Sequence, residues 1–153
     1  MKRETASGRI SRISTELRAE GYRLTLQRMA ILHALIGNMS HPSVEELHER
    51  VKVDYPQLSL ATVYRLVNLL KEHGEILEVN PRVFGARYDG CNPIPHPHLI
   101  CIECGAVEDV EVLGREWFTS IEQEVSQKTG YRIIRCNTDF FGICPRCQQR
   151  SAA

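Results

Sequence analysis

The sequence predicts an α+β protein of two domains: an N-terminal winged helix-turn-helix domain over residues 1–88 and a C-terminal α/β domain with a four-cysteine zinc site over residues 89–153. Three observations lead to this expectation. Apolar residues recur at helical spacing between residues 11 and 73,. After Gly74 the pattern changes to short extended runs,. Two Cys-x-x-Cys pairs, the spacing of a zinc site, lie in the second half,.

Helices are expected over most of the first half. Ser43 and Glu46 form a capping box, in which each side chain accepts the backbone N–H of the other residue,. Thr25 and Ser59 precede apolar-periodic segments and are expected to act as N-caps,. The expected helices cover residues 11–20, 25–36, a segment that begins at Ser43, and 59–73.

The last of these helices has the pattern of a recognition helix. Its apolar residues form one stripe, and Arg65 and Asn68 point away from it, with Thr62 and Tyr64 on the flanks,. Such a face can reach base edges and phosphates, although an ordinary amphipathic helix with a solvated face has the same pattern. The hairpin expected in "EILEVNPRVFGARYDG" would be the wing. Seven Lys and Arg against three Glu up to Leu35 also favour DNA binding, but a solvated tail would show the same excess,.

The second half combines strands with one helix. Two strands are expected in "HLICIECGAVEDVEV", a helix over residues 114–129, and one long strand in "YRIIRCNTDFFGIC",.

The four cysteines at positions 101, 104, 144 and 147 are expected to bind one structural Zn²⁺ with no open coordination position,. A single Cys-x-x-Cys could be a redox pair, whereas two pairs separated by strands favour zinc. The N-terminus lacks the apolar core of a secretory signal, and no apolar run approaches the roughly 20 residues of a membrane span,. A cytoplasmic location is therefore expected, where cysteines more often bind metal than form disulfides.

A second set of potential ligands contains no cysteine. His96 and His98 are two residues apart, so on a strand they would face the same side,. Asp89 and Asp109 are nearby acids, and His41 lies in the loop before a capped helix. Imidazoles with carboxylates suit Fe²⁺, Mn²⁺ or Zn²⁺, although each residue alone could equally be a surface residue.

The segments "GYRLTLQRMAIL", "HPSVEELH", "SLATVYRLVNLLKEHG", "RYDG", "HPHLICIECG" and "CPRC" together resemble the ferric uptake regulator (Fur) family of metal-dependent repressors. The resemblance implies a homodimer that binds a double-stranded DNA operator through its winged helices and pairs through the strands of its C-terminal halves. It also implies roles for particular residues. The DNA contacts would be Arg23, Thr62, Tyr64 and Arg65, and the regulatory metal ligands would be His41, Asp89, His96, His98 and Asp109.

Aspartate at both acidic positions resembles the peroxide-sensing PerR branch, since iron-sensing members usually carry glutamate there. The branch implies a regulatory Fe²⁺ or Mn²⁺ and, with Fe²⁺, oxidation of His41 or His96 by peroxide. The alternative is a zinc- or iron-uptake repressor (Zur- or Fur-like), because Cys91 lies where some Zur members place a thiolate ligand. The family's additional metal site is not expected. Pro95, Pro97 and Cys136 occupy its ligand positions, and Glu116 alone matches.

An enzyme is not expected. A zinc deaminase would carry His-x-Glu on a helix beside a Pro-Cys-x-x-Cys pair, and a thioredoxin-like reductase would carry its Cys-x-x-Cys at the start of a βα unit. The "CPRC" pair instead lies close to the end of the chain. No organic cofactor and no membrane partner are expected either.

Overall fold

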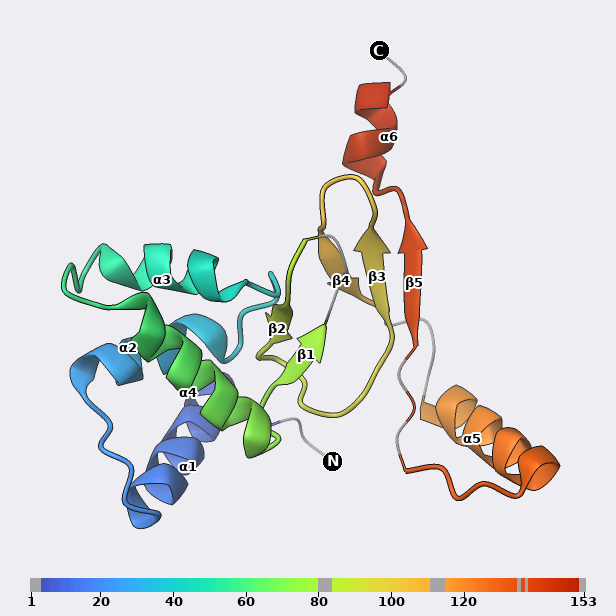
Figure 1. Cartoon of the computed structure of the whole chain (residues 1–153), viewed down its shortest axis with the longest axis horizontal. Coiled ribbons are helices and arrows are strands. Elements are labelled where there is room, and N and C mark those ends of the chain that lie inside the picture. Colours follow the sequence, from blue (N-terminus) through green and yellow to red (C-terminus); the bar gives the residue numbers. More distant parts are fainter. Residues whose placement is uncertain (1–3, 80–83, 111–114, 135, 137, 152–153) are drawn as a thin grey trace. The chain divides into compact units, whose positions relative to one another are not determined.

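The computed structural model describes residues 4–79, 84–110, 115–134, 136 and 138–151 (Figure 1). The chain divides into two compact units, unit 1 over Met1–Pro93 and unit 2 over Ile94–Ala153. Each helix of the described residues is too short or too polar to cross a membrane.

In its described residues, unit 1 has four helices followed by a two-stranded sheet. The helices are α1 (Ala6–Ala19), α2 (Leu26–Leu35), α3 (Val44–Lys52) and α4 (Leu60–Glu72). Strands β1 (Leu77–Val79) and β2 (Arg87–Asp89) pair antiparallel, with Leu77 opposite Asp89. This is the expected order of helices and hairpin. The turn expected at Asn80-Pro81 lies outside the described residues.

Side-chain caps fix where these helices begin. Thr25, Ser43 and Ser59 accept backbone N–H groups as expected, and both hydrogen bonds of the capping box are present,. Helix α1 begins at Ala6, not at Ser11, because Thr5 caps it by accepting the N–H of Gly8 at 3.1 Å,.

The core of unit 1 is one continuous apolar cluster. It takes the expected stripe of α4, where Val63, Leu66, Val67 and Leu70 are buried, while Arg65 and Asn68 are exposed. His33 also lies on a mostly apolar helix, but its side chain is exposed. The other helices supply most of the rest of the cluster, which includes Ile13, Leu17, Ile31, Leu32, Leu35 and Leu47.

Unit 2 contains a three-stranded mixed sheet and two helices. Strands β3 (His98–Cys101), β4 (Val107–Asp109) and β5 (Asp139–Gly142) lie in the order β4-β3-β5, with β3 antiparallel to β4 and parallel to β5. The helices are α5 (Arg115–Thr129) and α6 (Pro145–Ser151). Strands β3, β4 and helix α5 were expected, and the α+β fold with a four-cysteine cluster is confirmed.

Towards the end of the chain one expected strand is shorter than predicted, and one helix was missed. Among the described residues of "YRIIRCNTDFFGIC", where one long strand was expected, residues 139–142 form β5 and pair with β3, whereas residues 131–134 have no regular structure. Helix α6 was not expected. It begins at Pro145, a residue that suits the first position of a helix because it needs no hydrogen-bond acceptor there,.

Candidate functional site

The four cysteines of the two Cys-x-x-Cys pairs lie together in unit 2. Cys101 ends β3 and Cys104 lies in the following turn, while Cys144 and Cys147 lie at the start of α6. The four Sγ atoms are all within 4.8 Å of one another, and those of Cys104 and Cys144 are 3.8 Å apart. A tetrahedral Zn²⁺ about 2.3 Å from each sulfur would hold the sulfurs about 3.8 Å apart. The cluster therefore fits a structural zinc site.

Backbone hydrogen bonds shape this cluster. Gly105 has φ 70°, a left-handed conformation that lets its N–H bond to the carbonyl of Cys101 at 2.9 Å and close the turn,. The Cys101 N–H bonds to the carbonyl of Ala106 at 2.9 Å, and the Ile102 N–H to the carbonyl of Gly142 at 2.8 Å. The turn that carries the first pair is thus joined to the strand that leads into the second pair.

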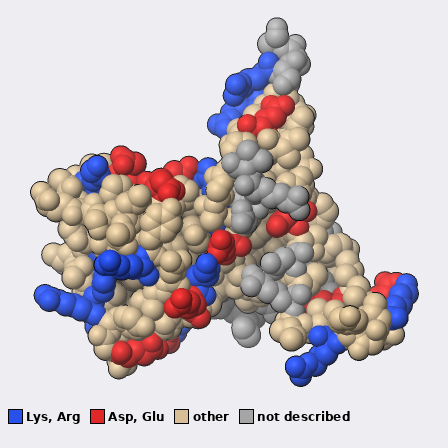
Figure 2. Space-filling model, viewed as in Figure 1, with Lys and Arg blue, Asp and Glu red and all other residues tan. Residues whose placement is uncertain are grey.

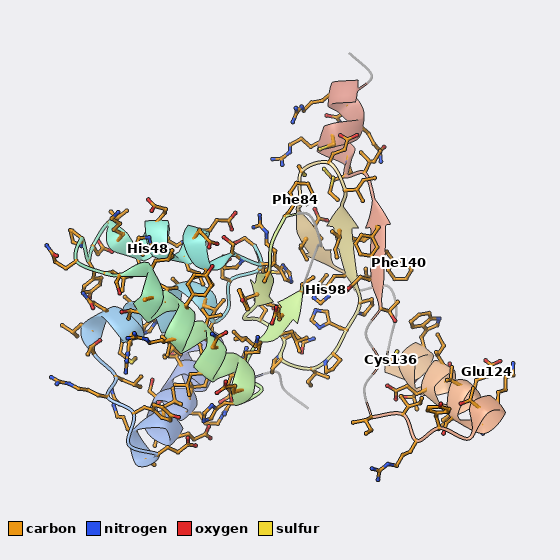
Figure 3. All side chains as sticks on the ribbon, in the orientation of Figure 1. His48, Phe84, His98, Glu124, Cys136 and Phe140 are labelled. Carbon is orange, nitrogen blue, oxygen red and sulfur yellow. The ribbon has the colours of Figure 1, made fainter. Side chains whose placement is uncertain are left out.

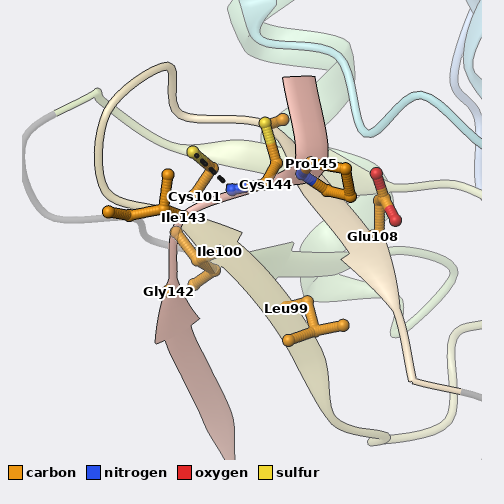
Figure 4. Close-up of a pocket in the computed structure, with 9 residues that line it drawn as sticks. Leu99, Ile100, Cys101, Glu108, Gly142, Ile143, Cys144 and Pro145 are labelled. Carbon is orange, nitrogen blue, oxygen red and sulfur yellow. Dashed lines mark hydrogen bonds between the residues drawn. The ribbon is translucent and has the colours of Figure 1, made fainter. Parts of the chain in front are cut away.

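The thiols of the cluster differ in acidity. The backbone N–H of Cys144 donates to Cys101 Sγ at 3.3 Å (Figure 4) and, with that of Cys104, lowers the pKa of Cys101 to about 6. The N–H of Ala106 lowers the pKa of Cys104. The pKa of Cys147 is raised to about 12, mainly by burial of its thiol and to a smaller extent by a hydrogen bond with Cys144. The Cys101 thiol is thus the more acidic of the two, and zinc binding must displace the proton of the less acidic Cys147,.

Beside the cysteines lies a small apolar cavity of about 120 Å³, seen in Figure 4. Leu99, Ile100 and Ile143 line it together with Pro145 and Cys101. Its wall thus includes residues from both strands that approach the cluster.

Three potential regulatory ligands meet within unit 2. His98 lies opposite Asp109 in the β3–β4 register, and His96 lies just before β3. Nε2 of His96 is 3.1 Å from Asp109 Oδ1, and Nε2 of His98 is 3.8 Å from the same oxygen. The two imidazole centroids are 4.4 Å apart. Two imidazoles and a carboxylate therefore converge at the start of β3, where Figure 3 labels His98.

Sequence reasoning missed one acid beside these ligands. Asp139 Oδ1 lies 3.5 Å from Nδ1 of His98, because β3 and β5 place these two residues opposite each other. The signal for this contact was the pairing of β5 with β3, which the sequence of the segment does not reveal.

The other two potential regulatory ligands lie together in unit 1. His41 and Asp89 are both buried, and one ligand atom of each lies within 4.8 Å of the other. The Tyr88 N–H bonds to the carbonyl of Pro42 at 3.1 Å and so joins the His41 loop to β2. The carboxylate of Asp89 accepts the backbone N–H groups of Cys91 and Asn92 on Oδ1, at 2.7 and 3.2 Å. Its orientation is thus set by the loop that follows it.

The residues expected at DNA lie mostly on the surface of unit 1. Arg23, Tyr64 and Arg65 are exposed, and Thr62 is half-buried with its hydroxyl 2.9 Å from that of Ser59 at the helix cap. The Tyr64 hydroxyl donates to Glu45 Oε1 at 2.7 Å, which lowers the pKa of Glu45 and raises that of Tyr64.

On the face of unit 1 that Figure 2 shows, charge alone does not mark a DNA-binding surface. In the view of Figure 2, basic and acidic side chains alternate over unit 1 rather than forming one continuous basic surface. The N-terminal basic excess is also smaller at the surface than the sequence suggests, because Arg9 is buried.

Cys91, the thiolate position of some Zur members, and two positions of the family's additional site, Cys136 and Glu116, lie apart from both ligand groups. Cys91 and Cys136 are half-buried and Glu116 is exposed on α5. Within the described residues, none of these three belongs to a group of His, Cys, Asp or Glu side chains close enough to hold one ion.

A His-x-Glu triplet, His73 to Glu75, has structural partners. His73 caps α4 and its Nε2 lies 2.8 Å from Glu20 Oε2, while Glu75 accepts two hydrogen bonds from Arg12, at 2.7 and 2.9 Å. The triplet therefore serves the packing of unit 1.

Comparison with known proteins gives one consistent result. Residues 19–141 match the model of the ferric uptake regulator family. The chain is 31% identical over 134 residues to the peroxide-responsive repressor PerR of Staphylococcus aureus (strain USA300), covering 88% of each chain. Its structure is similar to that of the Helicobacter pylori ferric uptake regulator Fur, which has three functional metal binding sites (TM-score 0.80, 25% identity, 97% of each chain). It is also similar to the Campylobacter jejuni peroxide stress regulator (TM-score 0.67, 28% identity, 90% of this chain and 96% of that chain).

Proposed function

The chain belongs to the ferric uptake regulator family, and from that premise we propose that it is a homodimeric repressor that senses peroxide through a regulatory Fe²⁺. Members of this family are metal-responsive transcriptional regulators and not enzymes, so the proposal concerns what is sensed and by which residues. The Cys101, Cys104, Cys144 and Cys147 cluster would hold the structural Zn²⁺.

The regulatory site would take His41 and Asp89 from unit 1 and His96, His98 and Asp109 from unit 2. Three imidazoles and two carboxylates are a donor set without thiolate, which suits Fe²⁺ or Mn²⁺. Because the ligands come from both units, metal binding would fix one unit against the other. This coupling is what would make DNA binding depend on the metal.

The single observation that carries the peroxide assignment is aspartate at both acidic positions, as in the PerR branch. Asp109 supports it because its Oδ1 lies 3.1 Å from the imidazole of His96. Similarity to PerR of S. aureus and to the C. jejuni peroxide stress regulator points the same way.

Bound Fe²⁺ would supply the reaction with H₂O₂ that oxidises a histidine ligand. In net terms one histidine and one H₂O₂ give one oxo-histidine and one water, so the imidazole loses two electrons and gains one oxygen atom. His41 and His96 are the candidates on the family pattern. Loss of one imidazole would release the metal and then the DNA.

DNA binding would use the outer face of α4, with Tyr64 and Arg65 toward the bases or backbone and Thr62 and Arg23 nearby. Support comes from the exposure of Tyr64 and Arg65 on a helix whose other face is in the core,. Arg23 is also exposed, in the segment that precedes α2. Dimerisation would use the sheet of unit 2. There the strand residues Leu99, Phe140 and Phe141 are exposed apolar side chains,.

A Zur-like function is the alternative, and the position of Cys91 favours it. This thiol is two residues from Asp89, and its own N–H binds that carboxylate. If Cys91 were a ligand, the softer donor would favour Zn²⁺ as the corepressor.

One experiment separates the two functions. The protein loaded anaerobically with Fe²⁺ is exposed to near-stoichiometric H₂O₂, and then DNA binding and peptide masses are measured. We expect a gain of about 16 mass units, one oxygen atom, on His41 or His96 and loss of DNA binding, while protein loaded with Mn²⁺ keeps its DNA. In parallel, Asp109→Ala should lose metal-dependent DNA binding and Cys91→Ser should keep it. The reverse pair of results would establish the Zur-like alternative.

A further inference from the structure

We propose that Arg9 of helix α1 is a positioning residue for the metal ligand Asp89, so that docking of α1 sets the affinity of the regulatory site. This inference rests on the proposed role of Asp89. Arg9 is 6% exposed, although it is charged and belongs to a segment that its composition marks as solvated or DNA-facing. Its guanidinium is buried among backbone carbonyls.

The Arg9 guanidinium contacts two places, the loop after Asp89 and Glu75. Nη1 donates to the carbonyls of Gly90 and Cys91 at 2.7 and 3.0 Å. Nη2 donates to the carbonyl of Glu75 at 2.6 Å and lies 3.7 Å from the Glu75 carboxylate. A planar guanidinium can hold several acceptors at once in a fixed geometry, which a lysine ammonium on a flexible stem does less well.

The two carbonyls that Arg9 binds belong to the same peptide groups that hold Asp89. The carbonyl of Gly90 shares a planar peptide group with the N–H of Cys91, and the carbonyl of Cys91 shares one with the N–H of Asn92. Those two N–H groups are the donors to Asp89 Oδ1, at 2.7 and 3.2 Å. Each peptide group is thus held at its oxygen by Arg9 and at its nitrogen by Asp89. Because hydrogen bonds in such a chain polarise one another, the cation also strengthens both bonds to the carboxylate.

Close packing leaves the segment few alternatives. The Gly37 N–H also donates to the carbonyl of Gly90, at 3.2 Å. A Cβ at position 90 would lie 2.1 Å from the carbonyl oxygen of Leu35, so the backbone of Gly90 lies directly against the end of α2. The peptide groups can tilt if Arg9 is lost, but they cannot move toward α2.

The coupling is reciprocal. A metal that binds the Asp89 carboxylate favours the loop conformation that receives Arg9, and a docked Arg9 favours the carboxylate orientation that binds the metal. Helix α1 is therefore stabilised by the regulatory metal, although none of its residues is a ligand.

The test uses Arg9→Met, a neutral side chain of similar length, with Arg12→Met as the matched control. Arg12 lies one turn further along α1 and binds the Glu75 carboxylate at 2.7 and 2.9 Å, but neither loop carbonyl. The full-length, zinc-loaded proteins are titrated anaerobically with Mn²⁺, and the absorption spectrum of Co²⁺ in the regulatory site is recorded. We expect Arg9→Met to bind Mn²⁺ about tenfold more weakly, within the range for residues that orient metal ligands, with an altered Co²⁺ spectrum and one zinc per chain retained. Arg12→Met should match the wild type in both.

Two further variants decide the remaining outcomes. Arg9→Lys keeps the charge and should fold, with an intermediate Mn²⁺ affinity; if Arg9→Met fails to fold, this variant carries the test. Wild-type Mn²⁺ affinity and Co²⁺ spectrum in a folded Arg9 variant, even one of lower thermal stability, would overturn the inference and leave Arg9 a packing residue. Asp89→Ala tests the proposed function separately. If it also binds Mn²⁺ like the wild type, the ligand assignment fails, and the inference fails with it.

Discussion

The two units of the molecule are stabilised by different means. In unit 1, one continuous apolar cluster reaches from α1 to β2 and includes fully buried residues from all four helices. In unit 2, the buried hydrophobic residues of the described part are Ile100, Cys101, Val107 and Cys147, and two of these four belong to the cysteine cluster. A unit of this size with so small a core needs a further source of stability, such as a bound metal or a partner subunit. We therefore expect unit 2 to depend on a bound metal, because the core of its described part is small and because the cysteines form a cluster.

The largest effect is expected from removing the zinc site, which should unfold unit 2 and leave unit 1 folded. Cys101→Ser should reduce the zinc content from one per chain to none and abolish the dimer, because structural zinc contributes on the order of 10–16 kcal/mol to small metal-dependent folds. Helix content from unit 1 should remain, as measured by circular dichroism beside metal analysis and sedimentation. Cys136→Ser, a half-buried cysteine outside the cluster, should keep both the zinc and the dimer. A zinc-free Cys101→Ser dimer would show that the cluster is not what holds unit 2.

A core substitution in unit 1 should do the opposite: it should destabilise unit 1 and leave the zinc site of unit 2 unchanged. Leu47 of α3 is fully buried in the apolar cluster, so Leu47→Ala should lower the free energy of unfolding by about 2–5 kcal/mol through lost contacts and a cavity,. Zinc content should stay at that of the wild type, because the cysteine cluster lies in unit 2. Urea unfolding measures the first and metal analysis the second. Loss of zinc from this variant would mean that the two units do not fold independently.

A surface substitution on α4 should separate DNA binding from stability. Arg65 is exposed, so Arg65→Ala should leave unfolding unchanged and weaken operator binding by about 1–3 kcal/mol if the guanidinium reads a base edge,. Fluorescence anisotropy with Mn²⁺-loaded protein measures the affinity. The control is Arg50→Ala, which removes an exposed charge from α3 and should cost less, equally for operator and random DNA,. Equal losses in both variants would mean that α4 does not read the operator.

Sequence patterns predicted unit 1 better than unit 2, and the reason is physical. Caps such as Ser43 and stripes such as that of α4 are local, so they can be found along the chain. The extent of β5 depends on pairing with β3, and α6 is too short to show a period. Burial of Arg9 follows from contacts with Gly90 and Cys91, far along the chain. Of the candidate metal ligands, the cysteine spacing was informative by itself, whereas the histidines and aspartates needed the family resemblance.

The smallest expected effect concerns an ion pair at the surface of unit 1. Two hydrogen bonds raise the pKa of His73 above its ordinary value of 6.5. The one with the Glu20 carboxylate has the larger effect, and the one with the carbonyl of Leu69 the smaller. The charged pair therefore stabilises the fold fully below pH 6.5, and this contribution is lost as the pH rises through the folded-state pKa. His73 and Glu20 side chains are 27% and 50% exposed, so the contribution should be below about 1 kcal/mol,.

Glu20→Gln should accordingly lower the free energy of unfolding more at pH 5.5 than at pH 8.5. The matched control is Glu16→Gln on the same helix, whose partner Arg12 lies 3.0 Å away and stays charged throughout this range, so its small deficit should not change with pH,. Urea unfolding at the two pH values measures both variants. A pH-independent deficit for Glu20→Gln would mean that the ionisation of His73 does not contribute to the stability of unit 1. Unit 1 would then owe its stability to the apolar cluster and the helix caps, and its contrast with unit 2, which we expect to depend on a metal, would be sharper still.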